Sequence, residues 1–583
     1  MLAGAALGLA GAGLVAVPFW QRHVLAARVQ TALPPLPDQA GLPAVLVERL
    51  HSAETAARSS ASGALAGVAE LGRLYHANGF TREAEACWRL LRDAQPGEPR
   101  WSYYLANLRR AASDYPEMEA LLEQTVRQAP DYAAAWWQLA ELKFKTGRLE
   151  AAQADYEKRL SLLPQDPYAR LGMARIALQQ HRAGDARQLL EQLLKDNPTF
   201  PTAHNLYVEM LVAEGNSAEA ARHRLTGRMT GRFRDPADPW LKELRDWCYD
   251  YSQLCNLGTI EYQTVPGDSY KAYFERAIKL RPDEPTAYEQ LGIIYLQLDQ
   301  PAKALEVLET GFARAKDSKP SILYYANLSR AYRALKRPAD AVRIVRQGLA
   351  ETGDHFELYD ALGVALGDLG EHAAAVEALQ AAVARNPGDA NANYNLAIAL
   401  LPLHRLDEAV EALHRSLTLQ PTFPSSLAML AQIEIDSGRW RDAAQYLEPL
   451  YESHPDLPQA RRMMAYWHLQ AGMEAEAKKD LTAAEHHYRE GAAVDPNHPE
   501  LQSHLGTLCL IQGRFADAVA PLEAYHRLQP DNAQSALYLG QAYASTGRMD
   551  EAKRVLTEGV QVAERTGNAK TAGYCREILQ QLP

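Results

Sequence analysis

The chain has 583 residues, of which 47% are hydrophobic and 23% charged, a composition that is ordinary for a folded protein. With 61 basic and 72 acidic residues the net charge is −11, so no bulk positive field favours nucleic acid as a partner. The five cysteines form no C-x-x-C pair, which argues against a zinc site or an attached haem. We therefore expect no metal and no cofactor.

An apolar leader opens the chain. Residues 2–20 carry no charge, and about 20 apolar residues suffice to cross a bilayer. Three interpretations stay open: a transmembrane anchor, a cleaved signal peptide and a buried apolar helix. Arg22 and Arg28 follow the run and would hold the rest of the chain in the cytoplasm, whereas bacterial proteins with such a leader are often exported. We assign residues 1–20 to an anchor or signal segment and expect a membrane-anchored or exported protein, with the periplasmic side favoured.

Two short features follow the leader. Residues 33–37 read Leu-Pro-Pro-Leu-Pro, which predicts a stiff extended spacer. Residues 44–58 carry an amphipathic pattern that predicts a helix, and we expect this helix to cap the first structural unit that follows it. We assign residues 21–64 to this spacer and capping helix.

One pattern then returns every 34 residues. Each unit reads as two amphipathic helices, and a small residue such as Gly363 or Ala397 leaves room for the second helix to approach the first. A proline has no N–H to donate and ends each second helix. The prolines that set the period are Pro96, Pro130, Pro164, Pro198, Pro387, Pro421 and Pro455.

This spacing resembles the tetratricopeptide repeat, a helix–turn–helix unit that stacks into a solenoid. The resemblance implies an all-α, right-handed α-solenoid of about fourteen such units with one irregular insertion. The unit ending at Pro130 departs from the pattern, since Arg109 and Met118 replace an aromatic residue and an alanine. Between Pro455 and Pro496 the step is seven residues too long, and a helix lengthened by about two turns would absorb it.

The repeat also divides the chain. We predict an N-terminal array over residues 65–221 and an irregular insertion or hinge over residues 222–261, where the register fails. A C-terminal array should then cover residues 262–566. Residues 567–583 should form a closing helix with a polar outer face, which such arrays need for solubility.

In this family the sixth position of each first helix points into a concave groove. The array resembles the superhelix of O-linked N-acetylglucosamine transferases, whose groove asparagines hold an extended peptide by its backbone. Amides at or near this position, which offer both a donor and an acceptor, are Gln138, Asn256, Gln290, Asn327 and Asn395. Aromatic residues that could add selectivity are Tyr103, Trp137, Tyr288, Tyr325 and Tyr394. Ala361 interrupts the row, and the alternative is a set of solvated polar side chains.

The insertion holds two further candidates. Five arginines without an acid between them could bind an anionic lipid or an acidic partner, or could form a solvated helix end; they are Arg222, Arg224, Arg228, Arg232 and Arg234. Cys248 and Cys255 would lie about 10 Å apart on one helix, beyond the roughly 7 Å that a disulfide spans. A disulfide between them would need a turn and an oxidising compartment.

No motif of catalysis accompanies the repeat: the sequence has no glycine-rich phosphate loop, no G-x-S-x-G and no H-E-x-x-H. We therefore expect a non-enzymatic scaffold that binds a partner peptide or helix in its groove and assembles a membrane-associated complex. The alternative is a regulatory or catalytic subunit whose activity depends on residues 222–261.

Overall fold

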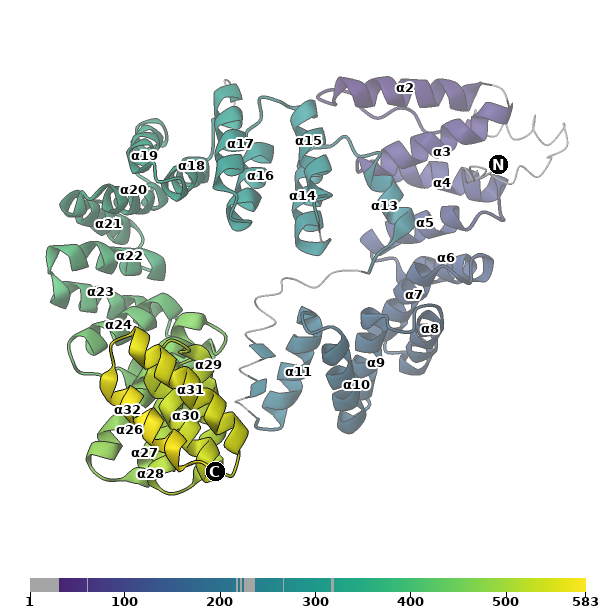
Figure 1. Cartoon of the computed structure of the whole chain (residues 1–583). Helices are drawn as coiled ribbons and strands as arrows, with labels where there is room; N and C mark the ends of the chain where they lie inside the picture. Colours follow the sequence, from purple (N-terminus) through teal and green to yellow (C-terminus); the bar gives the residue numbers. More distant parts are fainter. Residues whose placement is uncertain are drawn as a thin grey trace, which may run out of the picture. The chain divides into compact units, whose positions relative to one another are not determined.

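The computed structural model describes residues 31–583 except 60, 217–218, 221–222, 225–235, 266 and 316–318. In these ranges every regular element is a helix and none is a strand, which confirms the all-α solenoid (Figure 1). The predicted leader, residues 1–20, lies outside the described residues. No helix in the described ranges is both long and apolar enough to span a bilayer.

The chain divides into two compact units, residues 1–337 and 338–583. In the first unit a capping helix, α2 (Ala44–Arg58), has the predicted bounds and packs on α3. The first helices of the repeats are α3 (Ala61–Ala77), α5 (Pro99–Ala111), α7 (Ala133–Lys145), α9 (Pro167–Gln179), α11 (Pro201–Ala213), α14 (Tyr251–Thr264), α16 (Thr286–Gln297) and α18 (Ile322–Ala334). The second helices are α4 (Thr81–Ala94), α6 (Tyr115–Gln128), α8 (Leu149–Leu162), α10 (Ala183–Asp196), α15 (Tyr270–Leu280) and α17 (Pro301–Arg314).

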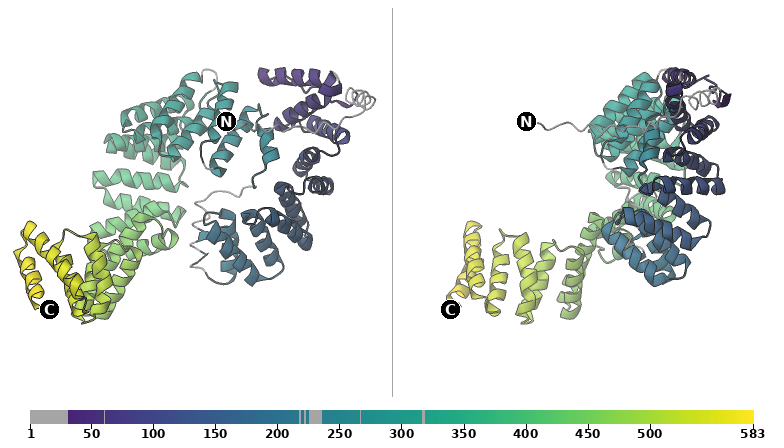
Figure 2. Two further views of the ribbon diagram at one scale, coloured as in Figure 1. Left: turned by 45° about the vertical axis from the view of Figure 1, so that its right-hand side comes forward. Right: turned by 90° about the vertical axis from the view of Figure 1, so that its right-hand side faces the viewer.

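The second unit begins with α19 (Pro338–Thr352) and ends with the closing helix α32 (Ala569–Gln581). Its first helices are α20 (Phe356–Leu369), α22 (Ala390–Leu400), α24 (Pro424–Asp436), α26 (Pro458–Ala477), α28 (Pro499–Ile511) and α30 (Ala533–Ser545). Its second helices are α21 (His372–Arg385), α23 (Leu406–Leu419), α25 (Ala444–Ser453), α27 (Leu481–Val494), α29 (Phe515–Leu528) and α31 (Met549–Arg565). The right-hand view of Figure 2 shows the last helices of this unit, first and second in alternation, stacked in chain order from green to yellow.

Glycine explains how closely the two helices of a pair approach. A Cβ built on Gly363 would stand 2.4 Å from Leu379, and one on Gly540 would stand 2.4 Å from Leu556. Real carbon atoms do not approach so closely, so a larger residue would have to displace the leucine side chain or shift the second helix. The predicted role of the small residue is confirmed in both pairs.

The long step after Pro455 is confirmed as a lengthened helix. α26 has 20 residues, whereas the neighbouring first helices α24 and α28 have 13 each. The seven extra residues make about two turns, so the apolar face keeps its direction. Met463, Met464 and Leu469 accordingly lie in one core cluster with residues of the adjacent helices.

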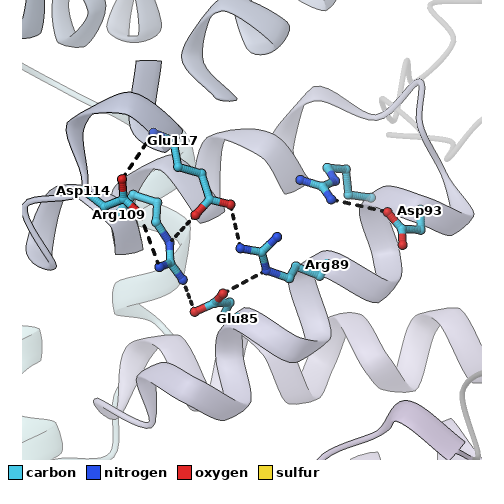
Figure 3. Close-up of polar contacts among 7 residues, drawn as sticks. Glu85, Arg89, Asp93, Arg109, Asp114 and Glu117 are labelled. Atoms are coloured by element: carbon cyan, nitrogen blue, oxygen red, sulfur yellow. Dashed lines mark hydrogen bonds and ion pairs between the residues drawn. The ribbon is translucent and has the colours of Figure 1, made fainter. Parts of the chain in front are cut away.

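The departing unit ending at Pro130 replaces an apolar contact with an ion network (Figure 3). Arg109 of α5 pairs with Glu85 of α4 and, at 3.3 Å, with Glu117 of α6. Arg89 of α4 reaches the same two carboxylates, at 2.8 Å and 2.6 Å. Charged side chains from three helices thus join two successive repeats where the sequence lacks the usual aromatic residue.

The predicted insertion, residues 222–261, contains part of a repeat. Its last residues belong to α14, which packs on α15 as the first helix of an ordinary pair. Residues 236–250, which include the short helix α13 (Pro239–Arg245), join no pair. In Figure 1 this teal helix lies against the purple helices of the first repeats, and its contacts with α3 agree.

Candidate functional site

Residues 236–250, here called the return segment, contact residues that precede them by 100 positions or more. The surface beneath them is made by the first helices α3, α5 and α7, here called the receptor surface. Leu244 is buried in the core cluster of these repeats, and Trp240 and Trp247 pack on its edge. The array therefore already holds a stretch of polypeptide on its first-helix side.

The carboxylate of Asp238 is the most strongly held group of the return segment. It accepts hydrogen bonds from the hydroxyl of Tyr103, from the hydroxyl of Tyr132 at 2.6 Å, and from the amide of Gln138 at 3.4 Å. Burial and the nearby Asp238 carboxylate raise the pKa of Tyr103 well above its ordinary value, which keeps its hydroxyl protonated as a donor. The backbone N–H of Leu241 also donates to Asp238, at 3.1 Å, so the same carboxylate caps α13.

Trp240 is seated between two tyrosine rings. Its ring stacks on Tyr132 with the centroids 3.6 Å apart and the planes at 9°, and it meets Tyr103 edge to face at 5.4 Å. The backbone N–H of Trp240 donates to the Tyr132 hydroxyl at 3.0 Å, and its backbone carbonyl accepts from the Tyr104 hydroxyl at 3.3 Å. Contacts of this kind contribute more than the burial of their area alone.

Asn78 holds the backbone at the other end of the return segment. Its amide nitrogen donates to the carbonyl of Trp247 at 2.9 Å, and its amide oxygen accepts from the N–H of Tyr249 at 2.6 Å. One side chain thereby pairs a carbonyl and an N–H of the backbone that leaves the turn after α13. The Arg49 guanidinium lies 4.8 Å from the Trp247 ring and donates to the Tyr249 hydroxyl at 2.7 Å.

The segment also contacts α14 and α15 of its own unit. Arg245 pairs at 3.4 Å with Glu261, which is buried. Arg276 donates to the carbonyls of Asp246 and Cys248, at 2.9 Å and 2.6 Å. Cys248 and Cys255 are both buried, and this structure holds them as free thiols, so a disulfide between them stays a prediction. Cys255 lies within α14 and Cys248 before it, and burial raises the pKa of the Cys255 thiol to about 12.

A pocket of about 350 Å³ lies beside the return segment, between its residues and those of α3, α5 and α14. His76 on its wall accepts from the Trp88 indole at 3.2 Å and lies 3.1 Å from the amide oxygen of Asn107. Burial lowers the pKa of His76 to about 4, so the ring is neutral and its single proton belongs on the nitrogen that faces Asn107. Asn107 and Asn256 also line the pocket, and Asn256 is exposed.

Five of the predicted groove residues are buried. The return segment and the neighbouring first helix cover two of them, while the other three pack against rings or helices of adjacent repeats, as the contact of Tyr325 with Phe312 shows. Such side chains present no open surface, so their prediction as exposed groove residues is corrected. They are Tyr103, Gln138, Trp137, Tyr288 and Tyr325.

The other predicted groove residues are at least partly open. Asn327 donates to Glu289 at 3.4 Å, and Asn395 donates to Asp360 at 2.8 Å. In each case the acid belongs to the preceding first helix, so these amides also join neighbouring repeats. The members of this partly open set are Asn256, Gln290, Asn327, Asn395 and Tyr394.

The second unit has a pocket on its own first helices. It measures about 500 Å³ and lies between α24 and α26. Gln432, Arg462 and Tyr466 line it, and Tyr466 is 37% exposed. An aromatic ring, an amide and a guanidinium thus meet on a surface built by first helices.

The predicted arginine patch lies largely outside the described residues. Arg224 is described and exposed. Arg222, Arg228, Arg232 and Arg234 fall in the undescribed positions.

Sequence reasoning missed Asn78, Tyr132 and Trp240. The repeat pattern indicated which face of a first helix points inward, and Asn78 and Tyr132 lie at the ends of such helices. The available signal was compositional, since residues 236–250 hold two tryptophans and a tyrosine that the repeat does not explain.

Comparison with known proteins agrees with the fold. Two family models described as tetratricopeptide repeat match the chain, one at residues 109–176, 147–210 and 510–570, the other at residues 271–320, 361–423, 428–477 and 469–533. The cellulose synthase operon protein C of Pseudomonas fluorescens is 29% identical over 336 residues, 53% of this chain and 25% of that protein. The protein of the same name from Xanthomonas axonopodis pv. citri is 25% identical over 442 residues, 73% of this chain and 28% of that protein.

The chain thus spans about a quarter of the length of these curated relatives. Among solved structures, YrrB, described as a TPR protein with an unusual peptide-binding site, is 18% identical. The match covers 33% of this chain and 96% of YrrB, with a TM-score of 0.26. Because the two repeat models together match more than half of its residues, the chain belongs to the tetratricopeptide repeat family.

Proposed function

We propose that the protein is a non-catalytic scaffold that binds a peptide or helix of a partner protein on its first-helix surfaces. The observation that carries the proposal is the receptor surface itself. There Asn78 pairs the backbone of residues 247–249 while Tyr103 and Tyr132 hold a side-chain carboxylate. A surface that binds polypeptide by backbone, ring and carboxylate has the chemistry that partner binding needs.

The setting we propose is a membrane-associated assembly. The leader, with its 19 uncharged residues, supports an anchored or exported protein. The two relatives named for a cellulose synthase operon support a place in a complex that serves a synthase of that type. In this proposal the chain positions other components and performs no chemical step.

The test compares two matched pairs of substitutions in the full chain. Asn256→Ala with Gln290→Ala removes partly open amides from first helices, whereas Gln153→Ala with Gln188→Ala removes amides from the second helices α8 and α10. Each chain is used to capture partners from solubilised membranes of its own host. We expect the first pair to weaken the capture of specific partners by about thirtyfold, if each amide contributes about 1 kcal/mol. Equal capture by all three chains, with equal helical content, would refute binding on the first-helix surface.

A further inference from the structure

We infer that the receptor surface recognises a short peptide in which an aspartate precedes an aromatic residue by two positions, and that the return segment occupies this site as a competitor. The inference rests on the proposed function and names both the partner chemistry and its regulation. Asp238 and Trp240 are the two side chains that display this chemistry.

The receptor surface contacts three separate features of its occupant. Hydroxyl and amide donors from α5, α7 and the residue before α7 converge on one carboxylate. Two tyrosine rings hold one indole. Asn78 pairs two polar groups of the backbone, so the backbone is bound apart from the charge and the ring, which the same two tyrosines hold.

The donors to Asp238 are specific for its carboxylate. Tyr103 and Tyr132 offer hydroxyl hydrogens, and both hydroxyls are paired when a carboxylate is present. An amide in its place would leave one hydroxyl facing an NH₂ group, and an alanine would leave both without an acceptor. A partner with asparagine or alanine at this position would therefore bind more weakly.

The two recognised side chains of the return segment lie nearer the surface than Leu244, which enters the core. Asp238 and Trp240 are both partly exposed, and α13 has seven residues and belongs to no repeat pair. The adjoining pocket of about 350 Å³ leaves room beside the segment, with Asn107 and Asn256 on its wall. A partner peptide can thus meet this surface next to the resident segment before it replaces the segment.

Pro239 defines the form of the peptide. It stands at the first position of α13, directly after the capping Asp238, where its fixed φ suits a helix start. The same carboxylate then caps the helix through Leu241 and binds the tyrosine hydroxyls. The partner element we expect is a helix start of the type Asp-Pro-aromatic, carried by a partner protein.

A labelled peptide with the sequence of residues 236–250 tests the inference on the full chain. We compare wild type with an opened variant, Asp238→Asn with Trp240→Ala, whose own segment has lost both features. The opened variant should bind the peptide at least about tenfold more tightly, because a surface occupied by its own segment is available for only a fraction of the time. A peptide that itself carries Asn and Ala at these two positions should bind neither chain.

A receptor-side substitution checks the location. Tyr132→Phe in the opened variant keeps the ring and removes the hydroxyl, and it should weaken peptide binding about tenfold. The single Asp238→Asn change, which is nearly isosteric, serves as a second opened chain with a smaller gain. Helical content and melting temperature are measured for every chain.

Three outcomes would overturn the inference. Equal peptide binding by wild type and the opened variant would mean that the segment does not compete. No binding by an opened variant of normal helical content, or loss of the fold in both opened chains, would show the segment to be a structural part only. Failure of the scaffold proposal is recognised separately, by equal partner capture by the wild type and the two substituted chains.

Discussion

Gly258 of α14 lies directly against the ring of Phe274 on α15, sixteen positions further along the chain. A Cβ built on Gly258 would stand 2.7 Å from Phe274 Cε2, much closer than two carbon atoms normally approach. The same spacing joins Gly292 to Leu308 in the next pair. The helix that begins inside the predicted insertion is therefore a regular repeat helix, packed as the others are.

Substitution of Gly258 by alanine should destabilise this pair. The added methyl group must displace the Phe274 ring or move α15, and overpacking of this kind costs about 1–3 kcal/mol. The matched control is Gly184→Ala in α10, where nothing lies within 4 Å of the new methyl group and the helix should gain up to about 1 kcal/mol. Urea unfolding followed by the helical circular dichroism signal measures both. Equal shifts would contradict the close contact.

The ion network of Figure 3 should contribute to stability where a single surface pair does not. Arg109→Ala removes the less exposed of the two arginines that Glu85 and Glu117 share and leaves them Arg89, and we expect a loss of about 1–3 kcal/mol in the free energy of unfolding. Arg127→Ala on α6 removes an exposed pair with Glu123 at 3.6 Å and should cost no more than about 0.5 kcal/mol. Unfolding of both variants in low and high salt measures the difference, and similar losses would show the network to be ordinary surface charge.

The sequence predicted the repeats better than the site, and the two have different physical origins. Helix bounds follow from local patterns, which is why the capping helix was predicted at residues 44–58 and found there. The contact between Asp238 and Tyr103 joins positions 135 apart, and no local pattern encodes it. Gln138 is buried beneath the same long-range contact. Its position on the helix therefore predicts which way its side chain points but not how deeply the side chain is buried.

The ionisation of Glu289 should make the protein less stable at neutral pH than in acid. Partial burial raises the pKa of its carboxyl, against the effect of hydrogen bonds from Ser321 and Asn327, so the fold disfavours the charged form. Stability is then complete below the ordinary pKa of glutamate and decreases as the pH rises through the folded pKa. Glu289→Gln should therefore raise the unfolding midpoint at neutral pH and lose this advantage in acid.

Glu98 is the matched control for Glu289. Partial burial alone would raise its pKa, but hydrogen bonds and charge from Arg100 hold the pKa below its ordinary value. The charged Glu98 therefore contributes to stability above the ordinary pKa of glutamate, and this contribution is lost in acid. The effect is opposite to that of Glu289. Glu98→Gln should lower the midpoint at neutral pH. If both substitutions shifted the midpoint in the same direction, the assigned environments would be wrong.

His76 should make the stability of the protein depend on pH, because its ring links α4 to α5 only while it is neutral. Its pKa is lowered to about 4 by burial, against the raising effect of Asn107, whereas the unfolded chain takes up the proton near the ordinary value of 6.5. Stability is therefore complete above about pH 6.5 and falls with the pH down to about 4, a loss of about 2 kcal/mol between pH 7 and 5. His76→Gln cannot take up the proton, so its unfolding free energy should depend less on pH over this range. Unfolding curves at several pH values measure both chains, and parallel curves would refute a buried neutral ring.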